Sequence, residues 1–385
     1  MRRVDRWAVS VTLCVLASVA AHAQAPPARP AAPPRVVSPE VAADGKVTFR
    51  LRAPQAQSVR LTSGGDIPQI PPNQTLELQK GGDGVWQLTI GPVDPGAYRY
   101  AFVVDSVNVV DPAQPNVSGS NDNVWSLFTV PGAKFMDTLD VPHGTVAEVR
   151  YHSAALGRWR SMHVYSPPGY GLKAQRYPVL YLLHGAFDSD DSWPTVGRAA
   201  DIVDNLIAER AAVPMIVVMP AGHTGPFTLN AAAGAGGLPI DEFVKDFQRD
   251  IKPYVESHYT VRTDRKSTAI AGLSMGGAQT LEIAIQNLQD YGYVGVFSSG
   301  VFSAPQSDEW AQRYAKQLDD PHAKAGLDVL WFATGADDFL LPTTKATVGL
   351  FEKHGFKPVF VQSTGAHTWI NWRNYLHEFA PQLFK

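Results

Sequence analysis

Short segments in which apolar and polar residues alternate fill the chain between residues 36 and 131. Clear examples are Val47–Arg52, Val85–Ile90 and Tyr98–Val104. Successive side chains of a strand point to opposite faces, so this period predicts strands that bury one face. Turn residues such as Pro95 and Gly96 separate the segments, and no stretch of helical spacing lies between them. The pattern predicts a small all-β sandwich over residues 36–131.

The pattern changes from about residue 140 onward. Continuous apolar runs at Pro178–Leu183, Met215–Met219 and Val329–Ala333 alternate with segments of helical spacing, such as Phe243–Val255. Strands buried on both faces appear as such runs, and crossover helices separate parallel strands. Residues 140–385 are therefore predicted to form an α/β domain with a doubly wound, mostly parallel sheet. Its active-site groups are expected on loops at the carboxyl ends of the strands.

The first 35 residues have the pattern of an export signal followed by a linker. Arginines at positions 2, 3 and 6 precede the apolar run Trp7–Ala20, and Ala21-His22-Ala23 has the small-x-small form of a cleavage site. Residues 1–23 are predicted to be a signal peptide and residues 24–35 a Pro/Ala-rich linker. We therefore expect a periplasmic or secreted protein that does not stay in the membrane after cleavage. The one cysteine, Cys14, lies inside the predicted signal, so no disulfide is expected.

Charge and motif content narrow the function classes. Thirty-three Lys and Arg residues against 36 Asp and Glu residues give a net charge of −3, and the basic residues form no stripe. Nucleic acid is therefore not an expected partner. The sequence has no H-E-x-x-H motif and no phosphate-binding glycine loop ending in Lys-Ser/Thr. We expect neither a metal nor a cofactor.

One motif carries nucleophilic chemistry. Gly272-Leu273-Ser274-Met275-Gly276 lies between an apolar strand-like run and a segment of helical spacing. This is the context of the nucleophile elbow of an α/β-hydrolase, in which the serine occupies a sharp turn and the flanking glycines let strand and helix pass closely. Ser274 is the predicted nucleophile. The N–H of Met275, at the start of the helix, is a predicted oxyanion donor.

A serine nucleophile needs a base and an orienting acid, which follow it in this order: serine, acid, histidine. His367 lies in a loop after the strand-like Val359–Val361 and is the predicted base. The acid is expected after Val329–Ala333, where Asp337 and Asp338 stand side by side. Spacing alone does not separate these two aspartates.

The second oxyanion donor is expected in the loop after Pro178–Leu183, which has the sequence His184-Gly185-Ala186-Phe187-Asp188. Gly185 permits the turn that directs the next N–H inward, which favours Ala186 as the donor.

Together these motifs resemble the esterase D and feruloyl esterase group, carbohydrate esterase family 1, to which enterochelin esterases and mycolyltransferases are related. The resemblance rests on five motifs in order: Leu182-Leu183-His184-Gly185 with Trp193, Met219-Pro220-x-Gly222-His223, the serine motif, Gly335-x-x-Asp338, and Gly365-x-His367 with Trp372. It implies that Asp338 is the acid and that Trp372 packs on an aromatic acyl group, although a core tryptophan explains that position equally well. Phe187, Trp193, His223 and Trp372 are the predicted substrate-binding residues. Phe187 stands where the family often has glycine, which favours a narrower acyl site.

The N-terminal segment resembles immunoglobulin-like early-set domains related to glycogen- and starch-binding modules. The resemblance rests on Gly84-Val85-Trp86, on Pro95-Gly96-x-Tyr98-x-Tyr100 and on Asp111-Pro112. It makes this domain a candidate for glycan contact, although aromatic residues in short strands usually belong to the core.

We therefore expect an exported serine carboxylesterase that releases feruloyl or acetyl groups from plant polysaccharide fragments. Its partner is a small ester or an acylated oligosaccharide. The alternatives are a siderophore ester hydrolase of the enterochelin type and a catalytically silent glycan-binding protein. The first alternative requires a cationic pocket, for which Arg373 and Lys345 are the basic residues nearest the motifs.

Overall fold

The computed structural model describes residues 35–121, 123–172, 174–225, 240–302 and 304–385. The predicted signal peptide, and the predicted linker except for Arg35, lie outside the described residues. Residues Val36–Lys385 form one compact unit. No helix in the described ranges is both long enough and apolar enough to cross a membrane.

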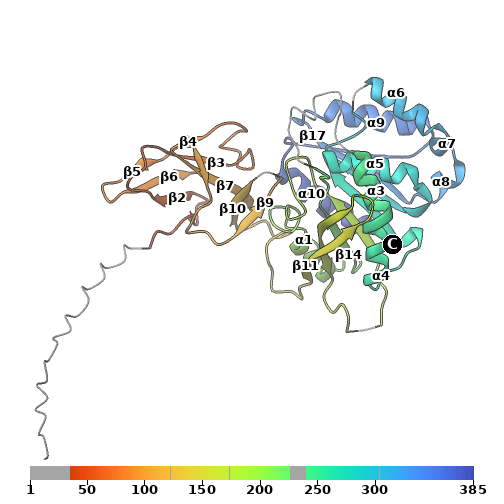
Figure 1. Cartoon of the computed structure of the whole chain (residues 1–385), viewed down its shortest axis with the longest axis horizontal. Coiled ribbons are helices and arrows are strands. Elements are labelled where there is room, and N and C mark those ends of the chain that lie inside the picture. Colours follow the sequence, from red (N-terminus) through yellow and green to blue (C-terminus); the bar gives the residue numbers. More distant parts are fainter. Residues whose placement is uncertain (1–34, 122, 173, 226–239, 303) are drawn as a thin grey trace, which may run out of the picture. The chain divides into compact units, whose positions relative to one another are not determined.

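Residues 40–130 contain strands and turns, as the alternating pattern predicts (Figure 1). The strands form two antiparallel sheets with the orders β1-β2-β6-β5 and β4-β3-β7-β10-β9, and β8 pairs with β7. Their bounds are β1 Glu40–Val41, β2 Val47–Arg52, β3 Val59–Thr62, β4 Leu76–Glu77, β5 Gln79–Lys80, β6 Val85–Ile90, β7 Gly96–Val104, β8 Val107–Val109, β9 Val117–Gly119 and β10 Val124–Val130.

Both N-terminal sheets contribute to one hydrophobic core. Phe49 of β2 lies edge-on to Tyr100 of β7 and to Phe128 of β10, with ring centroids 4.8 and 5.5 Å apart. Edge-to-face contacts of this kind stabilise aromatic clusters. We call this two-sheet segment the sandwich; that it is a separate, immunoglobulin-like domain stays a prediction.

The second part of the chain builds one eight-stranded mixed sheet with the order β11-β12-β14-β13-β15-β16-β17-β18. The pairs β11–β12 and β12–β14 are antiparallel, and the remaining pairs are parallel. This is the predicted mostly parallel sheet, and its edge at β11 and β12 is antiparallel. The strands are β11 Thr145–Ser153, β12 Arg158–Ser166, β13 Val179–Leu183, β14 Ile216–Pro220, β15 Thr268–Leu273, β16 Tyr293–Phe297, β17 Val329–Gly335 and β18 Val359–Ser363.

Helices cover both faces of this sheet. Apolar side chains of α3, α5 and α9 belong to one buried cluster, and those of α1 and α10 belong to another. The predicted helix over 243–255 is α3, a π-helical turn at Phe247–Ile251, and α4. The helices are α1 Ala199–Ala208, α3 Ile240–Asp246, α4 Lys252–His258, α5 Met275–Gln286, α6 Ala304–Arg313, α7 Ala315–Leu318, α8 Pro321–Ala325, α9 Leu341–Lys353 and α10 Trp369–Phe379, with 3₁₀ turns at Arg265–Ser267, Leu288–Asp290 and Ala380–Gln382.

Candidate active site

The serine motif forms a tight turn between β15 and α5. Ser274 has a φ of 52° and a ψ of −119°, a backbone conformation that residues with a side chain rarely adopt. A Cβ on Gly272 would overlap the carbonyl oxygen of Gly276, so strand and helix approach as closely as the motif predicts. This geometry places Ser274 at the N-terminus of α5, beyond the carboxyl end of β15.

His367 and Asp338 meet at the carboxyl ends of the neighbouring strands β17 and β18. The Nδ1 atom of His367 lies 3.1 and 3.0 Å from the two carboxylate oxygens of Asp338. Asp338 is buried and also accepts a 2.8 Å hydrogen bond from the backbone N–H of Leu340. Burial raises the pKa of Asp338, but the bonds from His367 and Leu340 outweigh it and hold the pKa below its ordinary value. Asp337 is exposed, so Asp338 is the aspartate that the fold brings to His367.

The loop after β13 lies beside the serine. β13 and β15 are parallel neighbours, with Leu183 paired to Gly272, so the loops that follow them adjoin. A Cβ on Gly185 would lie 3.4 Å from the Cβ of Ser274. The loop that contains Ala186 therefore lies next to the start of α5 at Met275. The N–H groups of Ala186 and Met275 stay the two predicted oxyanion donors.

His184 fixes the start of this loop. Its Nε2 accepts a 2.8 Å hydrogen bond from the N–H of Gly222, so its Nδ1 carries the proton donated to the carbonyl of Gly185 at 2.8 Å. Burial lowers the pKa of His184 and therefore favours this neutral form. His184 thus joins the loop after β13 to the loop after β14.

His223 lies next to His184, with ring centroids 5.5 Å apart. Burial, together with the neighbouring His184, lowers the pKa of His223 to about 4. His223 is consequently neutral at neutral pH and presents no positive charge to a substrate.

The predicted substrate-binding residues fall in different environments. Trp372 packs edge-on against His367 at 5.0 Å, and Phe187 is 59% exposed beside Ala186. Trp193 is 1% exposed, and its indole N–H donates to the carbonyl of Leu183 at 3.1 Å. Its prediction as a substrate-binding residue needs correction, because a ring enclosed and hydrogen-bonded in the core offers no surface to a ligand.

Arg373 does not supply the cationic pocket considered above. Arg373 is 2% exposed, and its Nη1 donates to the carbonyls of Ala97 and Val196 at 2.9 Å each. Burial lowers its pKa to about 10. Lys345 is exposed on α9. Arg373 therefore joins α10 to the sandwich instead of facing a substrate.

Two residues next to the site, Arg99 and Asp188, were not predicted from the sequence. Arg99 lies in β7 between two core tyrosines, where alternation assigns it to the outer, solvated face. Asp188 is one of several acidic residues in a loop and has no motif of its own. The structure pairs them in a buried ion pair of 2.9 Å. The sequence gives no sign of this pair, because it does not show that another part of the chain covers this face of the sandwich.

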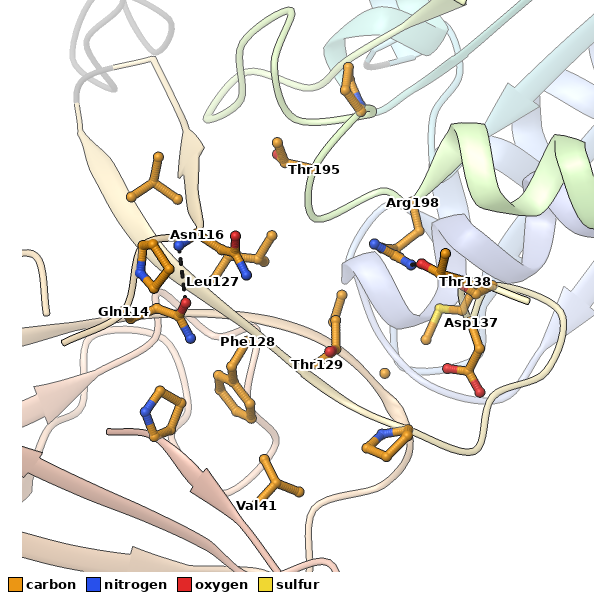
Figure 2. A pocket seen from close by; sticks show the side chains of 18 of the residues that line it. Val41, Gln114, Asn116, Leu127, Phe128, Thr129, Asp137, Thr138, Thr195 and Arg198 are labelled. Carbon is orange, nitrogen blue, oxygen red and sulfur yellow. Dashed lines mark hydrogen bonds between the residues drawn. The ribbon is translucent and has the colours of Figure 1, made fainter. Parts of the chain in front are cut away.

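No group of three or more His, Cys, Asp or Glu side chains in the described part of the chain is arranged to hold a metal ion. A cavity of about 840 Å³ lies between the sandwich and the segment that precedes α1. Figure 2 shows Asn116, Thr129, Thr195 and Arg198 on its walls. Ser274, Asp338 and His367 do not line it, so it is separate from the candidate active site.

Residues 153–383 match an esterase family model with the description "Putative esterase". The chain belongs to this esterase family. It is 33% identical over 358 residues to an endo-1,4-beta-xylanase/feruloyl esterase of Xylanibacter ruminicola, an alignment that covers 90% of this chain and 46% of the relative. The esterase therefore spans less than half of that relative.

Solved structures show the same fold. The esterase matches a CE1 ferulic acid esterase of Anaeromyces mucronatus with a TM-score of 0.56 and 24% identity, over 66% of this chain and 96% of that one. It matches the enterobactin esterase FES of Shigella flexneri with a TM-score of 0.61 and 18% identity, over 88% and 93%. These structures show the fold alone, and the family model and the Xylanibacter ruminicola relative confirm the resemblance predicted from the motifs.

Proposed function

We propose that this esterase is a serine carboxylesterase in which Ser274 is the nucleophile, His367 the general base and Asp338 the residue that orients His367. The observation that carries the proposal is the buried Asp338 carboxylate within 3.1 Å of His367 Nδ1, at the same edge of the sheet as the strained serine turn. An acceptor at Nδ1 keeps the proton there and leaves Nε2 free to take a proton from serine.

The proposed reaction proceeds through an acyl-enzyme. Ser274 Oγ attacks the ester carbonyl while its proton passes to His367 Nε2, and the carbonyl oxygen becomes an oxyanion between the N–H groups of Met275 and Ala186. Collapse of this intermediate expels the alcohol, which receives the proton from His367. Water, deprotonated by His367, then attacks the acyl-enzyme, and collapse of the second tetrahedral intermediate releases the acid and restores Ser274.

We propose feruloyl or acetyl esters of plant polysaccharide fragments as substrates. Support comes from the xylanase/feruloyl esterase relative and from the Trp372 ring beside His367. The exposed ring of Phe187, next to Ala186, is the proposed limit on acyl size, and the neutral His223 is a proposed polar contact. We also propose that the protein acts in the periplasm or outside the cell after loss of residues 1–23.

The N-terminal sandwich is proposed to contact the glycan part of the substrate. The cavity of Figure 2 offers amide, hydroxyl and guanidinium groups from Asn116, Thr129 and Arg198, which are suitable partners for sugar hydroxyls. Co-sedimentation with insoluble arabinoxylan tests this proposal. Asn116→Ala is expected to weaken retention, and hydrolysis of a small soluble ester is expected to stay unchanged.

The test of the reaction is hydrolysis of methyl ferulate, p-nitrophenyl acetate and acetylated xylan by the purified chain, with Ser274→Ala as the paired variant. Loss of the nucleophile is expected to lower kcat by about 10⁴-fold or more. Labelling of Ser274 by a fluorophosphonate separates an active enzyme from a silent glycan-binding protein. Absence of turnover with every ester, or equal activity in the variant, contradicts the proposal.

A further inference from the structure

A buried arginine of the sandwich reaches the loop that carries the proposed oxyanion donor. Arg99 Nε lies 2.6 Å from Asp66 Oδ2, and Arg99 Nη1 lies 2.9 Å from Asp188 Oδ1. Arg99, Asp66 and Asp188 are 9%, 7% and 3% exposed. Asp66 belongs to the sandwich, whereas Asp188 belongs to the loop after β13. A single guanidinium therefore holds one carboxylate from each part of the chain.

Arg99 stays protonated in the folded protein. Burial lowers the pKa of Arg99, but the two carboxylates outweigh it and raise the pKa above its ordinary value. Loss of one partner from a buried ion pair leaves an uncompensated charge and is strongly unfavourable. Separation of Asp188 from Arg99 in the folded protein is therefore unfavourable.

Asp188 lies close to the proposed reaction centre. Its N–H donates to the carbonyl of Gly185 at 3.1 Å, and its Oδ2 lies 3.2 Å from the point where a Cβ on Gly185 would stand. Its Oδ1 also accepts from the indole N–H of Trp369 at 3.3 Å. Trp369 begins α10, two residues after His367. A displacement of Asp188 therefore acts on both Gly185 and the segment that carries the histidine.

The same loop is fastened to the sandwich at further points. The N–H of Gly119, at the end of β9, donates to Asp191, and Ser192 Oγ donates to the carbonyl of Gly119 at 3.1 Å. The hydroxyls of Ser118 and Thr195 lie 2.7 Å apart, and Ser120 forms a β-bridge with Asp188. These contacts restrict the loop along its length, and Arg99 supplies the charged one.

We propose that the N-terminal sandwich is a structural part of the oxyanion hole, with Arg99 as a positioning residue that acts through Asp188 on Gly185 and Ala186. The inference rests on the proposed esterase function. Oxyanion donors work only when they lie about 2.7–3.1 Å from the developing charge, and a displacement near 1 Å costs as much as about 100-fold in rate. Arg99 is too far along the chain of contacts to touch the substrate itself.

Two variants and a matched control test this role. Arg99→Lys keeps the charge but loses the planar fork that reaches both carboxylates. Asp188→Asn keeps the size of the side chain and leaves Arg99 paired with Asp66. The control is Arg50→Lys in β2, because Arg50 also bridges two side chains, Glu40 and Gln87, but lies on the sandwich surface.

Each variant is assayed for kcat and KM with p-nitrophenyl acetate and for inhibition by phenylboronic acid, which forms a tetrahedral adduct with an active-site serine. Both measurements refer to folded molecules, and thermal unfolding gives the folded fraction. Arg99→Lys and Asp188→Asn are expected to lower kcat by about 10- to 100-fold, to leave KM nearly unchanged and to raise the inhibition constant by a similar factor. Arg50→Lys is expected to match the wild type.

Where Arg99→Lys does not fold, Asp188→Asn carries the test. An inhibition constant within about twofold of the wild type in the folded variants overturns the proposal, because a merely structural role changes the amount of active protein and not its affinity for the adduct. A wild-type chain that hydrolyses no ester overturns the proposed function instead. The two failures are thus distinguishable.

Discussion

Two adjoining loops at the carboxyl ends of β13 and β15 are held in place in different ways. The serine turn after β15 is fixed by its own backbone, because Gly272 and Gly276 touch across it and Ser274 N–H donates to the carbonyl of Phe297 in the next strand. The loop after β13 is fixed by charges on other elements, namely Arg99 of the sandwich and His163 of β12.

The difference shows how one loop of the hydrolase sheet can depend on the N-terminal sandwich for its position. A turn made of close backbone contacts tolerates little change. The position of a loop held by side chains of other elements depends on those elements. In this esterase the proposed nucleophile belongs to the first kind and the proposed Ala186 donor to the second.

The largest expected effect concerns Asp338, a residue that the parallel sheet itself positions. Asp338→Asn is expected to lower kcat by about 10⁴-fold, because the amide no longer favours the proton at His367 Nδ1. Asp337→Asn, one residue away and exposed, is the control and is expected to leave kcat within about twofold. The measurement is turnover of p-nitrophenyl acetate by both variants at equal folded fraction. Equal losses in the two variants would contradict the assignment of Asp338.

The next prediction breaks the serine turn from within. Gly272→Ala places a Cβ against backbone at Gly276, which moves only with the whole helix, so we expect a loss of stability of about 3 kcal/mol. Gly349→Ala is the control, since Gly349 is exposed within α9 and a Cβ there meets nothing within 4 Å. That substitution is expected to stabilise by about 0.5–1 kcal/mol. Urea unfolding measures both, and similar values for the two variants would refute the close-contact account.

The same contrast explains what the sequence could predict. Local patterns predicted the strands β2, β6, β13 and β14 and the serine turn, because these depend on near neighbours. The choice of Asp338 over Asp337 came from the family resemblance, since spacing is the same for both within one residue. Arg99 was missed because alternation says which face a residue takes but not what later covers that face. The prediction for Trp193 was wrong for a related reason: a motif gives its place in the chain but not its burial.

A smaller effect is expected in α10, the helix that contacts both His367 and the sandwich. Trp372 contacts His367, and the next residue, Arg373, donates to the sandwich carbonyl of Ala97. Trp372→Phe is expected to lower kcat/KM for methyl ferulate about 2- to 10-fold relative to p-nitrophenyl acetate, the worth of one aromatic contact. Trp159→Phe, at a ring 63% exposed, is the control. An unchanged ratio of the two substrates would show that Trp372 is a core residue only.

The smallest effect separates the two anchors of the loop after β13 by pH. His163 Nδ1 lies 3.3 Å from Asp190 Oδ2. Burial lowers the pKa of His163, but Asp190, with Asp191 and Glu148 beside it, raises the pKa above its ordinary 6.5. The charged imidazole therefore stabilises the fold fully below pH 6.5, and this contribution is lost as pH rises through the raised pKa.

The carboxylate side of this anchor has the opposite dependence. Burial raises the pKa of Asp190, but the neighbouring His163 and Ser161 outweigh it and lower the pKa below 3.8. Its contribution is present above pH 3.8 and is lost as pH falls through the lowered value. Asp190→Asn is therefore expected to reduce stability by about 1 kcal/mol near pH 5.5, roughly 2 °C in Tm, and by much less at pH 9.

Asp188→Asn is the matched comparison, because its partner Arg99 keeps its charge across this range. Its loss of Tm is expected to be the same at pH 5.5 and pH 9, since the raised pKa of Arg99 lies far above both. Thermal unfolding of the wild type and the two variants at both pH values gives the result. A constant offset for Asp190→Asn would mean that His163 is neutral in the folded protein. Of the two ion pairs that hold this loop in the described part of the chain, the one with Arg99 of the sandwich would then remain.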